Sequence, residues 1–183
     1  MGYTTDFSGQ FDLSRKLTED EASFLKMFAE TRRMSRDPEK VLALKGKERN
    51  IKCLALLNRL GLELGPNAEN YCGTGMCGQD HDPSIKEYNG SWGEEPTPFP
   101  SLWCQWVPTE DNMGLEWDDG EKFYEYVKWI EYLIEHFLTP WGIKVNGSVE
   151  WDGEERGDLG LIKVVDSVVT KSYGFISYGD GGE

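Results

Sequence analysis

The chain has 183 residues with 19 basic and 33 acidic side chains, which gives a formal net charge of −14. This length fits one domain, and 23 aromatic residues supply enough buriable surface to exclude global disorder. Its apolar runs fall far short of the roughly 18 residues that a membrane span needs, and its acidity argues against direct nucleic-acid binding by the acidic half.

The first elements predicted along the chain are a strand and a helix. Tyr3–Leu13 alternates loosely, as a strand does, although Ser8-Gly9 could interrupt it. Thr18 followed by Glu21 forms a capping box, which predicts that a helix begins there.

Residues 38–61 predict two more helical pieces that Gly46 separates. Ile51, Leu54, Ala55 and Leu57 are expected to share the buried face of the second piece. The regular periodicity then stops, so residues 65–100 are predicted to form a long loop.

The second half begins with a strand predicted over residues 102–107 and a partner strand at Leu115–Trp117. Asp118, with Glu121 three residues later, predicts the start of the helix with the clearest periodicity, which Pro140 ends.

Strands follow to the end of the chain. Asn146-Gly147 is typical of a type I′ hairpin turn, and Asp166-Ser167 predicts a second hairpin. We therefore expect an α+β fold in one domain over 1–175, in which two main helices pack on one face of an antiparallel sheet. A mostly helical insertion with the long loop occupies 38–100, and 176–183 form a flexible glycine-rich tail.

A group of cysteine and histidine residues is the candidate metal site. Cys72, Cys77, His81 and Cys104 could together hold a zinc ion. Their spacing matches no strong zinc template, so the cysteines could instead be small apolar residues. With Asp80 and Asp82, the 72–82 loop could alternatively form a metal-dependent hydrolase site; no other cofactor is expected.

Acidic residues are the candidate partner-binding groups. Residues 94–158 contain 16 acidic and 4 basic side chains, among them Glu116, Asp118, Asp119 and Glu121. Gathered on one side, they would attract a protein with a basic surface, although helix capping or a plain solvated surface also explains such residues. Exposed tryptophans anchor interfaces, and the candidates are Trp92, Trp103 and Trp106 unless both faces of the sheet are covered.

Arg32, Arg33 and Arg36 form a cationic cluster near the end of the first helix. They could pair internally with the acidic residues or hold an anionic small ligand such as a nucleotide signal.

Several phrases of the sequence resemble a family of uncharacterised proteins from bacteriophages and prophages. The phrases are Gly2–Gly9, Thr31–Met34, Ser101–Pro108, Trp117–Tyr124, Pro140–Gly142 and Asn146–Trp151. The resemblance covers 1–37 and 100–170 and fits less well over 38–99. It implies a protein made in the cytoplasm of an infected bacterium, and it transfers no catalytic residue.

The leading interpretation is a non-enzymatic phage accessory protein that binds and inhibits a host component. Anti-defence proteins, including anti-CRISPR inhibitors, form the class that this interpretation suggests. The acidic segment and the absence of a strong catalytic motif favour it over the nucleotide-binding and hydrolase alternatives.

Overall fold

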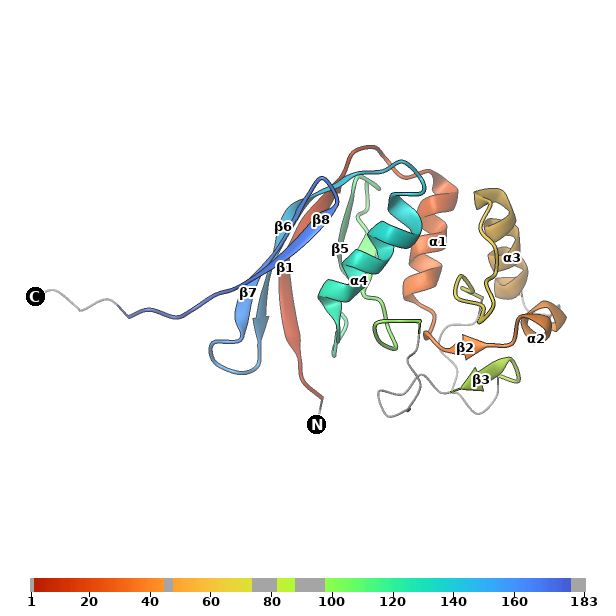
Figure 1. Ribbon diagram of the computed structural model, residues 1–183, viewed down its shortest axis with the longest axis horizontal. Coiled ribbons are helices and arrows are strands. Elements are labelled where there is room, and N and C mark those ends of the chain that lie inside the picture. The colour runs from red at the N-terminus through yellow and green to blue at the C-terminus, as the bar shows by residue number, and fades with distance from the viewer. Residues whose placement is uncertain (1, 45–47, 74–81, 88–97, 179–183) are drawn as a thin grey trace, which may run out of the picture.

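The computed structural model describes residues 2–44, 48–73, 82–87 and 98–178. At its centre lies an antiparallel sheet of six strands in the spatial order β4-β5-β1-β6-β7-β8 (Figure 1). The fold is therefore α+β, as predicted. The strands are β1 (Thr5–Leu13), β4 (Trp106–Pro108), β5 (Gly114–Trp117), β6 (Val145–Gly153), β7 (Leu159–Val165) and β8 (Val168–Tyr173).

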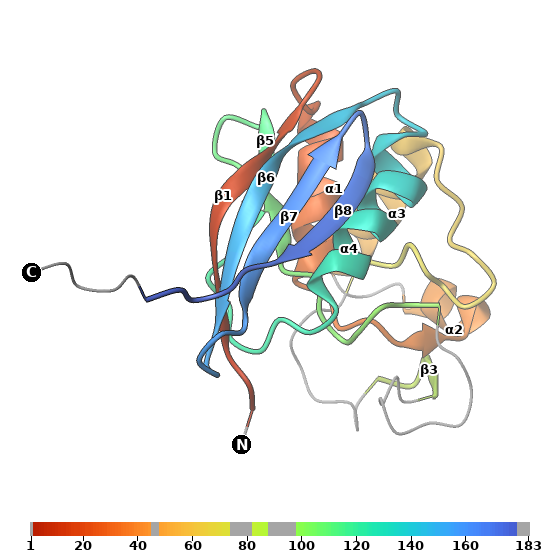
Figure 2. The same ribbon diagram turned by 60° about the vertical axis from the view of Figure 1, so that its left-hand side comes forward.

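Two helices pack on one face of this sheet. They are α1 (Glu19–Ala29) and α4 (Tyr126–Leu133), and α4 continues into the π-helix η2 (Ile134–Leu138). Both ribbon views place them on the same side of the strands (Figures 1 and 2). Because side chains alternate along a strand, Phe11, Val149 and Ile162 point toward the helices and are fully buried in the core.

The insertion contains two helices, as predicted: α2 (Pro38–Ala43) and α3 (Glu48–Leu60), with α3 packed against the side of α1 away from the sheet (Figure 1). The predicted buried face of α3 is wrong at Ile51, which is 58% exposed. The buried residues are instead Asn50, Cys53, Leu56 and Leu57.

Asn50 turns toward the interior because it has a buried partner. Its side-chain oxygen accepts a hydrogen bond of 2.5 Å from the Tyr71 hydroxyl, which satisfies a polar group that would otherwise be costly to bury. Beside these helices, β2 (Ser35–Arg36) and β3 (Ile85–Glu87) form a small antiparallel sheet. β3 lies within the segment predicted as a continuous loop.

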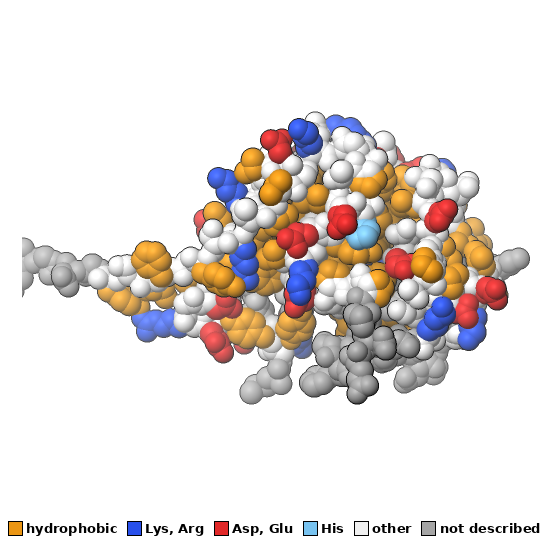
Figure 3. All heavy atoms as spheres, in the orientation of Figure 1, with side chains coloured by type: hydrophobic (Ala, Val, Ile, Leu, Met, Phe, Trp, Pro, Cys, Tyr) orange, Lys and Arg blue, Asp and Glu red, His pale blue; other side chains and the backbone are white. Residues whose placement is uncertain are grey.

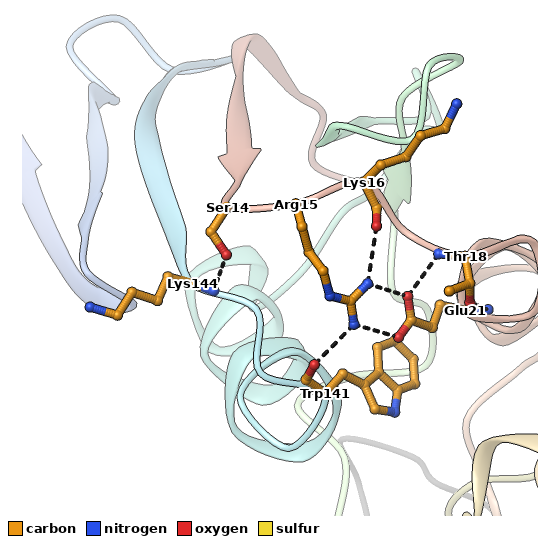
Figure 4. A network of polar contacts seen from close by, with 7 residues as sticks. All are labelled: Ser14, Arg15, Lys16, Thr18, Glu21, Trp141 and Lys144. Atoms are coloured by element: carbon orange, nitrogen blue, oxygen red, sulfur yellow. Dashed lines mark hydrogen bonds and ion pairs between the residues drawn. The ribbon is translucent and has the colours of Figure 1, made fainter.

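The start of α1 confirms the predicted capping box. The Thr18 hydroxyl accepts from the Glu21 backbone at 3.2 Å, and the Glu21 carboxylate accepts from the Thr18 backbone at 2.8 Å. Arg15 binds the same carboxylate through two hydrogen bonds of 2.7 and 2.8 Å and also donates to the Trp141 carbonyl at 2.9 Å (Figure 4). This network joins β1, α1 and the segment after η2.

Asn146-Gly147 does not form a hairpin turn, so that prediction is wrong. Both residues lie inside β6, which pairs with β1 without a break over nine positions. Gly147 has a φ of +125°, and a Cβ atom there would lie 2.8 Å from the Gln10 carbonyl oxygen of β1. Glycine is therefore needed for the close approach of two strands.

The helix predicted from Asp118 begins instead at Tyr126, so that boundary is also wrong. The Asp118 carboxylate accepts from the Gly120 backbone at 2.9 Å, which makes a local turn. Asp119, Lys122 and Glu125 all have a positive φ, between 55° and 61°, which a right-handed helix excludes.

Two further features concern the ends of the predicted elements. The strand expected over 102–107 is shorter, because β4 begins at Trp106. The turn at Asp166-Ser167 is confirmed: both residues have a positive φ, as a type I′ turn requires, and join β7 to β8.

None of the described helices has both the length and the apolar content that crossing a lipid bilayer demands.

Candidate functional site

The face of the sheet opposite the helices is not covered by any described element (Figure 2). We call it the open face. On β1 and β6 it carries every second residue, and these residues are exposed whereas their neighbours point into the core. On the three inner strands its residues are Asp6, Ser8, Gln10 and Asp12 of β1, Asn146, Ser148, Glu150 and Asp152 of β6, and Leu159, Leu161, Lys163 and Val165 of β7.

The open face is acidic, with Asp6, Asp12, Glu150 and Asp152 against Lys163 as its basic residue. The strand register places Asp6 directly opposite Asp152. Like charges in this position destabilise a sheet. Within the described ranges, none of these four carboxylates has a Lys or Arg nitrogen within 4 Å, so their charge is not neutralised by an ion pair.

A shallow cleft of about 520 Å³ crosses the open face at this acidic end. Asp6, Glu150 and Asp152 contribute carboxylates to it, and Leu159 and Leu161 contribute apolar surface. Carboxylates beside apolar side chains suit a long cationic side chain, because its stem can cover the leucines while its charge meets the acids.

A second acidic depression lies where β5 separates from β1. The two strands pair at Phe11–Leu115 and Asp12–Gly114 and the ladder then stops. The resulting depression of about 340 Å³ is lined by Glu116, Asp118 and Asp119. Partial burial of its carboxylate raises the pKa of Asp118, and the nearby charge of Asp119 raises it further.

The structure therefore brings three of the four predicted acidic site residues together at one depression. Glu121 does not line that depression; it is exposed, and its backbone carbonyl accepts from the Gln105 amide at 2.9 Å. The acids of residues 94–158 are not gathered on one side, because Glu131 and Glu135 lie on the exposed side of α4 and η2. On the surface seen in Figure 3, acidic and basic side chains are interspersed.

The sequence prediction missed Asp6 and Asp12 on the open face. Both belong to the N-terminal part of the chain, in which basic residues outnumber acidic ones. The alternation of polar and apolar residues along β1 is the sequence signal that marks them as outward-pointing.

The arginine cluster is largely internal. Arg33 is 2% exposed and donates to the carbonyls of Thr31 at 2.9 Å and Tyr71 at 2.8 Å. Burial lowers the pKa of Arg33 to about 10. Arg36, also buried, forms an ion pair with Asp82, and Arg32 is half-buried. The predicted anion site is therefore not assembled, because Arg33 and Arg36 are used to join segments within the fold.

The tryptophan candidates differ in exposure. Trp106 is 1% exposed, and its indole nitrogen donates to the Tyr126 carbonyl at 2.9 Å, so the prediction of an interface anchor is wrong for this residue. Trp103 is half-buried. Trp92 lies outside the described residues.

Of the predicted zinc ligands, Cys77 and His81 lie outside the described residues, as does Asp80 of the hydrolase alternative. Cys72 is fully buried against Cys53, whose sulfur accepts from the Cys72 backbone at 3.1 Å. Burial raises the pKa of Cys104 to about 12, which favours an uncharged thiol. Among the residues that the structure describes, no three metal-ligating side chains come together.

Comparison with known proteins gives no relative from which a function could be transferred. No protein-family model, no curated protein and no solved structure matches the chain.

Proposed function

We propose that this protein is a non-enzymatic binding protein whose open face takes a basic surface of a partner protein. The observation that supports this most directly is the uncovered acidic end of the sheet, where Asp6 opposes Asp152 beside Glu150. A cationic side chain placed there would gain charge-assisted hydrogen bonds and would relieve the repulsion between the two aspartates.

The resemblance of the sequence to phage proteins suggests what the binding of a basic partner is for. We infer that the partner is a bacterial defence component, such as a CRISPR effector, which the protein inhibits. An acidic surface can occupy a groove that normally holds nucleic-acid phosphates, because both present negative charge to the same basic residues.

The experiment compares the wild-type protein with the triple variant D6N/E150Q/D152N, which removes three negative charges from the open face at nearly constant shape. The matched control is E39Q/E131Q/E135Q, which removes three charges from exposed positions on α2, α4 and η2. Each protein is immobilised and exposed to bacterial lysate at low salt, and the retained proteins are then purified for affinity measurements.

We expect a partner that the wild type and the control both retain and that D6N/E150Q/D152N binds at least about tenfold more weakly, because each charge-assisted contact contributes about 1.5–3 kcal/mol. Expression of the wild type should also restore phage plating on a host with an active CRISPR system, whereas the triple variant should not. Equal behaviour of the triple variant and the control would contradict the proposal.

A further inference from the structure

Three aromatic rings meet at the β8 edge of the sheet, on the side that faces the helices. They belong to Tyr126 at the start of α4, Trp151 of β6 and Tyr173 at the end of β8, and we call them the aromatic cage. The Trp151 ring centre lies 5.8 Å from the centres of both tyrosine rings, at interplanar angles of 45° and 87°. β8 and α4 lie side by side in this region (Figure 2).

Lys171 of β8 fills this cage. Its ammonium nitrogen lies 4.7 Å from the ring centre of Tyr173, 4.9 Å from that of Trp151 and 5.4 Å from that of Tyr126. All three distances lie within the range of cation–π attraction. Across the described part of the chain, the structure gives this ammonium no carboxylate within 4 Å and no hydrogen-bond acceptor, so the rings are the groups that hold it.

Neighbouring residues fix the central ring of the cage. A Cβ atom at position 160 would collide with the Trp151 indole, so Gly160 allows the ring to lie across β7. The indole nitrogen donates to Asp158 at 3.2 Å, and the other oxygen of Asp158 accepts from the Tyr3 hydroxyl at 2.5 Å. Trp151 is 2% exposed and is held in one orientation, as a preorganised binding surface requires.

Asp158 also makes the region favourable for positive charge. Desolvation, followed by the negative charge of Asp158, raises the pKa of Tyr126 to about 12. The negative charge of this carboxylate therefore acts on the cage although the carboxylate itself lies outside the rings, and this favours a cation between them.

We propose that the aromatic cage is a binding site for a quaternary ammonium group and that Lys171 is its internal plug. A primary ammonium is strongly hydrated through its three N–H donors, and contact with the rings displaces part of that water. A quaternary ammonium has no N–H donor to satisfy, so the same three rings suit it better. Lys171 is exposed and lies on an edge strand, so its side chain can leave the cage without breaking the β7–β8 ladder.

The plug lowers the apparent affinity of the cage for an external ligand. A side chain tethered beside the cage competes at a high effective concentration, so the ligand binds only the fraction of molecules in which Lys171 has moved away. The cage lies on the helix side of the sheet, although Trp151 and Tyr173 also line the cleft of the open face. The proposal does not depend on the proposed function.

The test uses Lys171→Ala, which empties the cage, and Lys171→Thr as a second variant with a side chain that suits a strand. Choline is titrated into each protein while the indole N–H resonance of Trp151 is followed by NMR. The uncharged probe is 3,3-dimethylbutan-1-ol, which has the shape of choline without its charge. Lys163→Ala, on the other face of the sheet, is the matched control.

We expect both Lys171 variants to bind choline about tenfold more tightly than the wild type and the Lys163→Ala control, as loss of a cation–π competitor of this size implies. The added substitution Tyr173→Ala should abolish the gain, and because Tyr173 is 74% exposed it should leave the core intact. A trimethyllysine peptide that binds more tightly than choline would identify a protein ligand, and equal binding would identify a small molecule; either result supports the cage.

Two results would overturn the proposal. One is the absence of any choline-dependent shift in both folded Lys171 variants at tens of millimolar ligand, because three cation–π contacts acting together correspond to a Kd in that range. The other is equal binding of choline and 3,3-dimethylbutan-1-ol, because the cage would then recognise shape and not charge.

Discussion

Glu21 shows how one side chain can combine capping with an ion pair. Its side chain is 7% exposed, and its carboxylate closes the capping box while Arg15 binds it through two hydrogen bonds. The substitution Glu21→Gln keeps an oxygen for the Thr18 backbone but removes the charge. We expect it to lower the free energy of unfolding at pH 7 by about 1–2 kcal/mol, a value reduced because Arg15 is partly exposed.

The pH dependence separates this ion pair from a simple loss of packing. The hydrogen bonds from Arg15 hold the pKa of Glu21 below its ordinary value of 4.5 in the folded protein. The stabilisation is therefore fully present above pH 4.5 and is lost as the pH falls through the folded-state pKa. Urea unfolding from pH 7 to pH 3 should show the wild type and Glu21→Gln converging. Glu19→Gln, in the same turn and exposed, should lose about 0.5 kcal/mol or less; an equal loss would contradict the ion-pair account.

The arginines after α1 show what residue type alone cannot predict. Arg32, Arg33 and Arg36 look equivalent in the sequence, but Arg33 lies over the Phe28 ring at 3.9 Å and is enclosed by the 69–71 loop, which it contacts through the Glu69 and Tyr71 carbonyls. That loop is 36 to 38 residues away along the chain. Burial of an arginine depends on such distant carbonyls, so a local cluster cannot distinguish a structural role from ligand binding.

At the scale of elements, the start of α4 contains a strained residue. Glu125 precedes the helix with a φ of 55° and makes no side-chain capping bond. Glycine adopts this conformation without a Cβ penalty, so we expect Glu125→Gly to raise the free energy of unfolding by about 0.5–1 kcal/mol. Glu125 also pairs with Lys128 at 2.9 Å on the surface. Lys128→Ala removes the same pair without changing the backbone and should be nearly neutral. Thermal unfolding compares the two, and a destabilised Glu125→Gly would show that the φ carries no strain.

Elements whose signals are local were predictable from the sequence. The capping box of Thr18 and Glu21 and the turn at Asp166-Ser167 are examples, because each is completed within four residues. The signals at Gly147 and Asp118 were misleading. A glycine can serve a turn or a close approach of strands, and at Gly147 the neighbouring strand β1 decides between the two. An aspartate can cap a helix or close a local turn, and at Asp118 the backbone conformation of residues 119–125 decides.

The sequence predicts the chemical type of the candidate site, an acidic surface, but not where its residues lie in the fold. The acidic excess of residues 61–183 is visible in the sequence, but its members divide between the open face, the β5 depression and the exposed side of α4. Asp6 comes within reach of Asp152 through a pairing that spans 146 residues. Because strand register brings distant residues together, the arrangement of charge is a property of the whole molecule.

The acidic surface that is proposed to bind a partner therefore lowers the stability of the folded protein. Removing the Asp6–Asp152 repulsion by D6N/D152N should raise the free energy of unfolding by about 0.5–1 kcal/mol at low salt, because like charges in register destabilise a sheet and cross-strand pairs contribute up to about 1 kcal/mol. The gain should shrink near 1 M salt, at which the Debye length is about 3 Å. A double-mutant cycle of D6N, D152N and the double variant isolates the coupling between the two carboxylates. Purely additive effects, or a gain that persists at high salt, would mean that the two charges do not interact. If the gain in stability is accompanied by weaker partner binding, the repulsion is retained because the partner relieves it.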